Sequence, residues 1–152
     1  MNSILRRRRA LMGAQITEAQ WEEIPFSYDQ FGVAYSSSNT SWNTTVNTIR
    51  VYTTANGTYK NASMLFSTSS GYEYRYACKI SVTTGKGKIA CRTTGGTTVS
   101  GTSSITVSNE QNIDVIFQHN ATINKLSLFC TWSTSEAGNV TFTDLKLYRR
   151  PI

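Results

Sequence analysis

The stretch from residue 72 to residue 84 restricts the fold of this chain more than any other feature of its sequence. Apolar residues occupy every second position from Tyr74 to Val82, and the positions between them are polar or charged except Ala77. Successive side chains of a β-strand point to opposite faces, so this alternation predicts a strand with one buried and one wet face. Residues 124–133 repeat the pattern, with Phe129 as an exception on the polar side. Both segments therefore belong to a half-buried antiparallel sheet.

From Trp21 onward, short alternating runs are separated by Gly, Asn, Ser and Thr clusters at intervals of about 8–12 residues. A chain of 152 residues has room for one domain with one core. We therefore expect an all-β protein, a jelly-roll β-sandwich of about 8–9 antiparallel strands in residues 21–152, preceded by a short basic arm or helix in residues 1–20. The predicted strands are 23–35, 46–54, 62–68, 72–84, 87–94, 103–108, 112–119, 124–133 and 139–149.

The turn at residues 83–88 predicts a hairpin, because Gly85 can supply the positive φ that a tight turn needs. Such a hairpin would place Cys78 close to Cys91, which permits a cross-strand disulfide. The chain has three cysteines, an odd number, and no export signal, and both features favour buried reduced thiols. Whether Cys78 and Cys91 are bridged stays open at this point.

The last predicted strand changes the parity of its apolar residues, which have even numbers up to Phe142 and odd numbers from Leu145 onward. A β-bulge at Thr143 and Asp144 would keep both halves of the strand facing the core. A carboxylate at such a bulge can bind a hard cation such as calcium together with backbone carbonyls, so Asp144 is a candidate metal ligand. An aspartate that caps an ordinary turn is the alternative.

The net charge of +6 is unevenly placed along the chain. Residues 10–148 contain nine basic and nine acidic residues, and the excess belongs to Arg6, Arg7, Arg8 and Arg9 at one end and to Arg149 and Arg150 at the other. This pattern indicates a charged arm on a neutral body, with no basic face. We therefore expect the four arginines of the arm to bind a partner, and we do not expect nucleic acid to be that partner.

The residues after the arm do not resemble a secretory signal, because Ala10, Leu11 and Met12 are followed at once by polar and small residues. No stretch approaches the ~18 apolar residues that cross a bilayer. We expect a protein without membrane contact that is made in the cytoplasm.

The sequence offers little of the chemistry that enzymes need. His119 is the only histidine, and no G-x-S-x-G motif is present. The cysteines and His119 lie too far apart in sequence to resemble the close ligand pairs of structural zinc sites. The nine acidic residues leave a glycosidase pair open, but no pair stands out. We predict a protein that binds or assembles and does not catalyse a reaction.

Sugars are commonly recognised by exposed aromatic rings, which offer flat apolar faces to the C–H groups of a pyranose. Trp42 lies in a polar stretch where no predicted strand requires a buried indole, so it is the first candidate for a glycan contact. Tyr35 and Tyr72 are further candidates. The alternative for Trp42 is a ring that covers one end of the sandwich.

Residues 42–148 resemble the carbohydrate-binding-module type of jelly roll. Four stretches carry the resemblance, namely residues 69–74, 104–107, 124–129 and 140–148. In such modules the closing strand often contains an aspartate that helps to hold a structural calcium ion, and Asp144 matches that position. The resemblance thus implies calcium at Asp144, although the acidic N-terminal loop that supplies the other ligands has no counterpart in this sequence.

Residues 1–12 resemble the beginning of small structural proteins of tailed bacteriophages of gut bacteria. This resemblance implies a virion protein in which Arg6–Arg9 dock on other virion proteins. The jelly roll would be displayed on the particle as a capsid decoration, head fibre or tail appendage, in several copies, and could attach to host-surface glycans. A free-standing carbohydrate-binding module is the alternative. The position in head or tail, the host and the glycan stay open.

Overall fold

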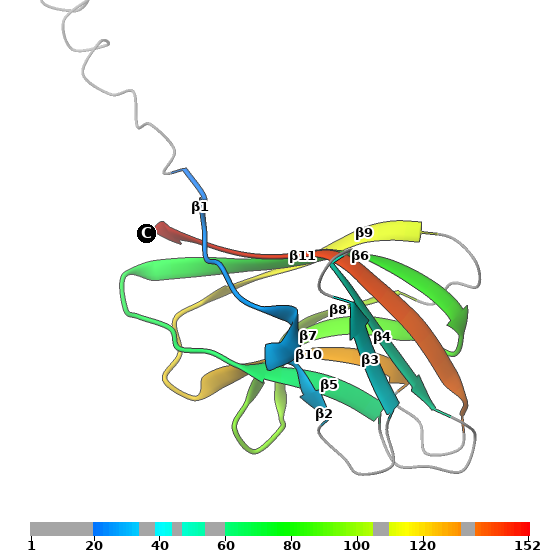
Figure 1. The fold of residues 1–152 in the computed structure, drawn as a ribbon. Helices are drawn as coiled ribbons and strands as arrows, with labels where there is room; N and C mark the ends of the chain where they lie inside the picture. Colours follow the sequence, from blue (N-terminus) through cyan, green and yellow to red (C-terminus); the bar gives the residue numbers. More distant parts are fainter. Residues whose placement is uncertain (1–19, 34–38, 44–46, 54–59, 105–109, 132–135) are drawn as a thin grey trace, which may run out of the picture.

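The computed structural model describes residues 20–33, 39–43, 47–53, 60–104, 110–131 and 136–152. Strands in this part of the chain form two sheets that face each other (Figure 1). In chain order the elements are β1 (Glu22–Glu23), η1 (Tyr28–Gln30), β2 (Gly32–Val33), β3 (Asn39–Asn43), β4 (Thr48–Thr53), β5 (Lys60–Leu65), β6 (Tyr72–Thr84), β7 (Gly87–Thr93), β8 (Thr98–Ser104), β9 (Glu110–Gln118), β10 (Ile123–Thr131) and β11 (Gly138–Pro151).

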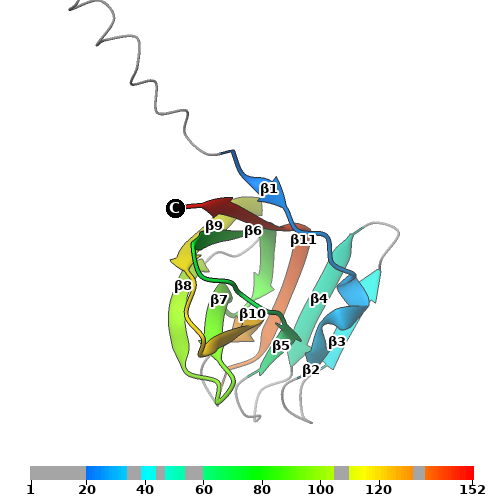
Figure 2. The same ribbon diagram turned by 90° about the vertical axis from the view of Figure 1, so that its left-hand side faces the viewer.

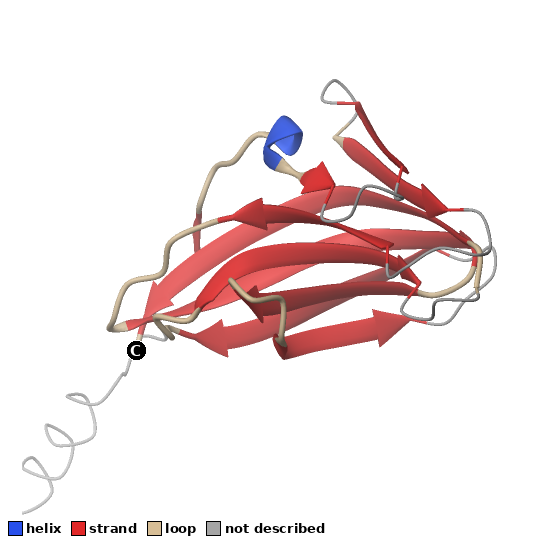
Figure 3. Ribbon diagram, turned by 90° about the horizontal axis from the view of Figure 1, so that it is seen from below, coloured by secondary structure: helices blue, strands red, loops and turns tan. Residues whose placement is uncertain are grey.

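The strands are divided between two antiparallel sheets (Figure 2). Sheet 1 has the order β3-β4-β11-β6-β9, with β1 paired to β11, and sheet 2 has the order β2-β5-β10-β7-β8. This arrangement confirms the predicted all-β sandwich, and two of its eleven described strands have only two residues each. The one helical element in the described residues is the short 3-10 turn η1 (Figure 3). No helix in these residues is long and apolar enough to cross a membrane.

The core lies between the sheets and is built from the alternating residues that the sequence indicated. The even-numbered side chains of β6 from Tyr74 to Val82 are buried, and β10 contributes Leu126, Leu128 and Cys130. The two segments that were expected to be half buried therefore form one strand of each sheet. Burying a side chain of this size contributes about 1.5–3 kcal/mol to folding, so the two strands supply much of the driving force.

The bulge predicted in the last strand is present. The pairing of β11 with β6 shifts register between Thr143 and Lys146, and Asp144 adopts a positive φ of 51°. Phe142 and Leu145 on either side of this point are both buried, as the change of parity requires. The backbone amide of Leu145 donates a hydrogen bond to the Tyr28 hydroxyl at 2.9 Å, so the bulge is anchored by a side chain from η1.

The strands of the structure differ from the predicted ones in three main places. Residues 23–35 were predicted as one strand, but their described part, residues 23–33, contains the last residue of β1 and the whole of β2, separated by η1. Residues 39–43 were not predicted as a strand because they are polar, yet they form β3 at the edge of sheet 1. An edge strand is held by backbone hydrogen bonds to one neighbour and does not need an apolar pattern. Strand β8 begins earlier than the predicted 103–108, whose last four residues lie outside the described part of the chain.

The cysteines Cys78, Cys91 and Cys130 are buried free thiols. Burial raises the pKa of the Cys78 and Cys91 thiols well above the usual range. Because the thiolate is the reactive form, we expect both residues to react with a thiol reagent at pH 8 at least about tenfold more slowly in the folded protein than in urea. Mass spectrometry of the labelled protein would measure this. Fast labelling of the native chain would contradict it.

The Tyr76 hydroxyl is buried and has no hydrogen-bond partner among the described residues. We expect Tyr76→Phe to raise the free energy of unfolding by about 1–2 kcal/mol, because it removes a desolvated polar group without loss of a bond. Tyr28→Phe is the matched control, since it deletes the bond to Leu145 and should lower the free energy of unfolding by a similar amount. Urea unfolding measures both. A loss of stability in Tyr76→Phe would show that its hydroxyl is bonded.

Candidate binding face of sheet 2

The two sheets differ in charge. The strands of sheet 1 contain six basic and six acidic residues, whereas those of sheet 2 contain four basic residues and no acidic one. The four are Lys60, Lys88, Arg92 and Lys125. The neutral body predicted from the sequence is thus an average over two sheets of unlike composition. The count along the chain missed this because it does not reveal which strands share a sheet.

The charges of sheet 1 are largely neutralised by ion pairs. Arg75 binds Asp114 at 2.7 Å, and Arg150 binds Glu73. The ammonium group of Lys79 lies 3.8 Å from the Glu110 carboxylate. Two further pairs join β11 to β1, namely Lys146 with Glu23 at 2.7 Å and Arg149 with Glu22 at 2.8 Å. Sheet 1 therefore presents a salt-bridged surface with little unbalanced charge.

Phe129 stands at the centre of the outer face of sheet 2. It belongs to the parity of β10 that points away from the core, and its neighbours in register are Asn61 in β5 and Lys88 in β7. Although Phe129 is outside the core cluster, the residue is only 6% exposed. The Lys88 ammonium lies 5.4 Å and the Arg92 guanidinium carbon 5.1 Å from the ring centroid, both within the range of cation–π attraction. An aromatic ring covered by two cations is therefore built into this face.

A polar network surrounds the ring. The Asn61 side-chain oxygen accepts hydrogen bonds from Ser63 Oγ at 3.0 Å and from Arg92 Nη1 at 3.3 Å. Ser63 shares a further hydrogen bond with Ser127 at 2.8 Å. Asn61 is fully buried, and its Nδ2 has no hydrogen-bond partner within the described residues. Because the oxygen of the amide is already engaged, Nδ2 is left as an unused donor.

Two glycines allow the cations to lie close over the sheet. A Cβ atom at Gly101 would lie 3.2 Å from Lys88 Cε, and one at Gly96 would lie 2.8 Å from Arg92 Nη2. Gly96 also has a φ of 91°, and its carbonyl oxygen accepts a hydrogen bond from Arg92 Nε at 2.7 Å. Burial, and secondly the charge of Arg92, lower the pKa of Lys88. The residues Asn61, Ser63, Lys88, Arg92, Ser127 and Phe129 are called the Phe129 face below.

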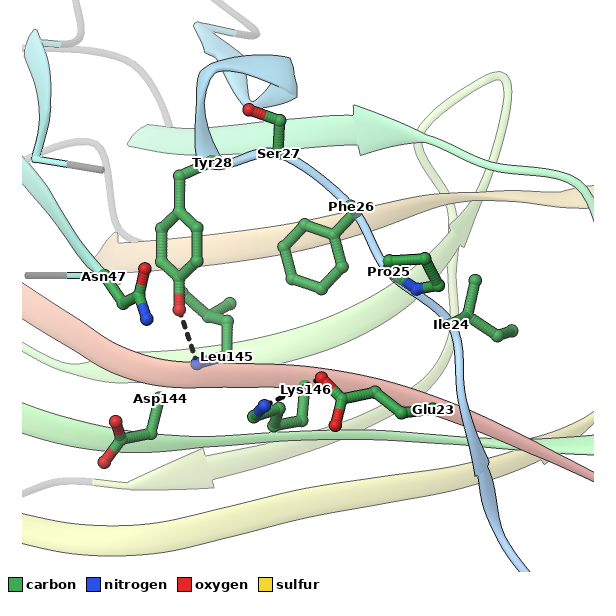
Figure 4. A pocket seen from close by; sticks show the side chains of 10 residues that line it. All are labelled: Glu23, Ile24, Pro25, Phe26, Ser27, Tyr28, Asn47, Asp144, Leu145 and Lys146. Carbon is green, nitrogen blue, oxygen red and sulfur yellow. Dashed lines mark hydrogen bonds and ion pairs between the residues drawn. The ribbon is translucent and has the colours of Figure 1, made fainter. Parts of the chain in front are cut away.

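A second candidate region is a pocket of about 350 Å³ between residues 23–28 and β11 (Figure 4). Tyr28 points onto the backbone of Leu145, and the Lys146 ammonium binds Glu23 beside it. Asp144 also lines this pocket and is exposed.

The residues of this pocket do not fit a calcium site in which Glu23 and Asp144 act together, because the Lys146 ammonium already supplies the positive charge at Glu23. In the described part of the chain, no three His, Cys, Asp or Glu side chains gather as metal ligands. Calcium held by Asp144 with backbone carbonyls stays a prediction.

No protein-family model and no curated protein matches this chain. Several solved structures are similar to this chain. A CBM4 carbohydrate-binding module has a TM-score of 0.57 at 12% identity, with 82% of this chain and 81% of that chain covered. A family 29 module complexed with mannohexaose has a TM-score of 0.55 at 11% identity, and the match covers 87% of this chain and 92% of that chain. The fold is that of a carbohydrate-binding module.

A third match extends over only part of a larger protein. The CBM22-1 and GH10 modules of xylanase 10B from Clostridium thermocellum, complexed with xylohexaose, have a TM-score of 0.55 at 12% identity. The match covers 87% of this chain and 28% of that one. None of the three structures is described as a virion protein. The comparisons therefore confirm the jelly-roll resemblance and give no support to a phage origin.

The module fold separates the residues that the sequence proposed for glycan contact. Trp42 lies in β3, an edge strand of sheet 1, in register with the buried Ile49, and so it is part of a strand and not of a loop. Tyr72 begins β6 of the same sheet, with β4 and β11 between, and the Arg149 guanidinium lies 5.2 Å from its ring centroid. Tyr35 and the four arginines Arg6–Arg9 lie outside the described residues.

The sequence did not predict the Phe129 face. Its one signal was the apolar exception at Phe129 on the polar side of an otherwise regular strand. Its partners Asn61 and Arg92 carried no comparable signal.

Proposed function

We propose that this chain is a non-catalytic carbohydrate-binding module that binds a glycan on the Phe129 face. The observation that carries the proposal is the buried ring of Phe129 on the outer face of sheet 2, surrounded by an amide, a guanidinium, an ammonium and two hydroxyl groups. Binding sites for small ligands combine apolar surface with a few placed polar groups, and sugars offer both C–H faces and hydroxyl groups to such a site.

The fold supports this assignment. Similar sandwiches have been solved with xylohexaose and with mannohexaose, and those sugars are the ligands of those proteins. On this chain the partly exposed polar side chains of the Phe129 face are Ser63 and Lys88, while Asn61, Ser127 and Arg92 are buried. These groups favour recognition of ligand oxygen atoms.

A glycan array with the wild type, Phe129→Leu and Trp42→Ala tests the proposal and separates the two candidate sites. Leucine keeps most of the apolar volume of Phe129 but removes the ring, so the variant should fold, which circular dichroism checks. We expect the wild type to bind at least one glycan, Phe129→Leu to lose about tenfold in affinity, and Trp42→Ala to bind like the wild type.

Two outcomes would contradict this expectation. Loss of binding in Trp42→Ala alone would move the site to the residue that the sequence proposed. If the wild type bound no glycan on arrays of plant, bacterial and animal glycans, the proposed function would be wrong.

A separate proposal concerns the location of this protein, which we place in a virion. We keep the prediction that residues 1–20 form a basic arm and that Arg6–Arg9 anchor the chain to other virion proteins, in several copies, by charge-assisted hydrogen bonds. Its support is the run of four arginines and the resemblance of residues 1–12 to phage structural proteins. Deletion of residues 2–12 should leave a folded module that is absent from purified particles. Incorporation of the shortened chain would contradict the anchor.

A further inference from the structure

We propose that the bulge of β11 carries a second glycan site, which binds a neutral oligosaccharide in a groove centred on Asp144. The site is separate from the Phe129 face and goes beyond the proposed function. Two hollows meet there, the pocket of about 350 Å³ in Figure 4 and a hollow of about 300 Å³ over β6 and β9, and Asp144 lines both. Volumes of this size are typical of sites for small ligands. The two hollows together are called the Asp144 groove below.

The groove exists because β11 changes its partner at the bulge. On one edge β11 pairs with β4 as far as Thr143, and the strap before η1 rejoins that edge where the amide of Ile24 donates a hydrogen bond to the Leu147 carbonyl. The stretch 144–146 between these points has no strand beside it on that edge within the described residues. Asp144, with its positive φ, points outward there and is exposed, so a ligand has access to its carboxylate.

The polar side chains of the groove are accessible and unengaged. Asp144 in its centre, Asn47 in the pocket and Asn112 in the second hollow are all exposed. None of the three side chains forms a hydrogen bond or an ion pair with another described residue. A carboxylate accepts hydrogen bonds, and an amide both donates and accepts them, so this set matches the hydroxyl groups of a sugar, which do both.

An apolar surface borders these polar groups. The ring of Phe26 stacks on that of Tyr28 at a centroid distance of 5.7 Å, and it remains partly exposed. Phe26 and the exposed Pro25 both line the pocket, as Figure 4 shows. Aromatic rings offer a flat apolar face to the C–H groups of a pyranose. The pocket therefore combines the two kinds of contact that a sugar residue makes.

The charges around the groove favour an uncharged ligand. Its lining contains three acidic and three basic residues, namely Glu23, Asp114 and Asp144 with Arg75, Lys79 and Lys146. Lys146 is paired with Glu23 and Arg75 with Asp114, both at 2.7 Å, and Lys79 lies 3.8 Å from Glu110. Because the lining is balanced, the groove has no excess charge that would select an anion or a cation.

A titration of the full chain, labelled with nitrogen-15, by xylohexaose, mannohexaose and cellohexaose tests the site by NMR. We expect at least one of these sugars to shift the amide signals of Asn47, Asp144 and Leu145. Asp144→Asn should lower the affinity about tenfold, because it removes a charged acceptor while asparagine tolerates the positive φ. Asp29→Asn is the matched control, since Asp29 is an exposed carboxylate outside the groove, and it should leave the affinity unchanged.

The position of the shifted signals separates this site from the proposed function. Shifts confined to the Phe129 face would overturn the second site and keep the proposed function, whereas shifts confined to the Asp144 groove would support the second site and contradict the Phe129 face. If no sugar shifts the groove signals at millimolar concentration, or if Asp29→Asn weakens binding as much as Asp144→Asn, the inference is wrong. It is wrong too if calcium chloride shifts these signals and the sugars do so only in its presence, since Asp144 would then be a cation ligand.

Discussion

Replacing Phe142 by alanine is expected to lower the free energy of unfolding by about 3–5 kcal/mol. Phe142 is fully buried in β11, the central strand of sheet 1, where it is in register with Ile49 of β4 and Ile80 of β6. Both neighbours are buried too, and they are held by backbone pairing on each side. Because they cannot move into the space, truncation leaves a cavity.

Urea unfolding of Phe142→Ala measures this loss, and Ile116→Ala is the matched control. Ile116 lies on the outer face of β9 in the same sheet and is 50% exposed. Its truncation should change the free energy of unfolding by only about 0.5 kcal/mol. Equal losses in the two variants would mean that the core is not where the two sheets place it.

Gly138→Ala is expected to destabilise the fold by about 3 kcal/mol, although it adds a single methyl group. A Cβ atom at this buried position would lie 2.2 Å from the Cys130 carbonyl oxygen and 3.0 Å from its sulfur. Gly138 begins β11 in sheet 1, and Cys130 lies in β10 of sheet 2. The glycine thus permits close approach of the sheets at one end of the sandwich, and backbone atoms must shift to admit a side chain.

Gly32→Ala serves as the control for Gly138→Ala. A Cβ atom at Gly32 meets no atom within 4 Å, and its backbone is not in the left-handed region. This substitution should be neutral or stabilising by about 0.5 kcal/mol, since it reduces the freedom of the unfolded chain. Thermal unfolding of the two variants compares them directly. A stable Gly138→Ala would show that β10 and β11 can separate at little cost.

Stability and the proposed glycan binding depend on opposite sides of the same strand in sheet 2. Leu126 and Leu128 of β10 face the core, while Ser127 and Phe129 belong to the outer face. The period of two that specifies the core therefore directs every other side chain away from it. Variants of Phe129 should thus affect binding more than those of Phe142, and variants of Phe142 should affect stability more.

The periodicity of the chain predicted much of the fold. Alternation in 72–84 and 124–133 predicted β6 and β10, and the parity change beside Asp144 predicted the bulge that the structure contains. These features are local, because the direction of a side chain along a strand depends only on its neighbours in sequence. The polar edge strand β3 was missed because its pairing with β4 depends on backbone groups, which have no pattern in the sequence.

The candidate site was decided by tertiary structure. Arg92 and Asn61 are 31 positions apart in the chain, and Ser63 and Ser127 are 64 apart. Their meeting depends on the strand order β5-β10-β7, which no local pattern reports. The sequence by itself determined an all-β chain with half-buried strands, because side-chain alternation is a local property. Only the tertiary structure brought strands with basic and without acidic residues together in sheet 2 and left Asn61 with an unused donor. These properties arise when strands that are distant in sequence pair with each other.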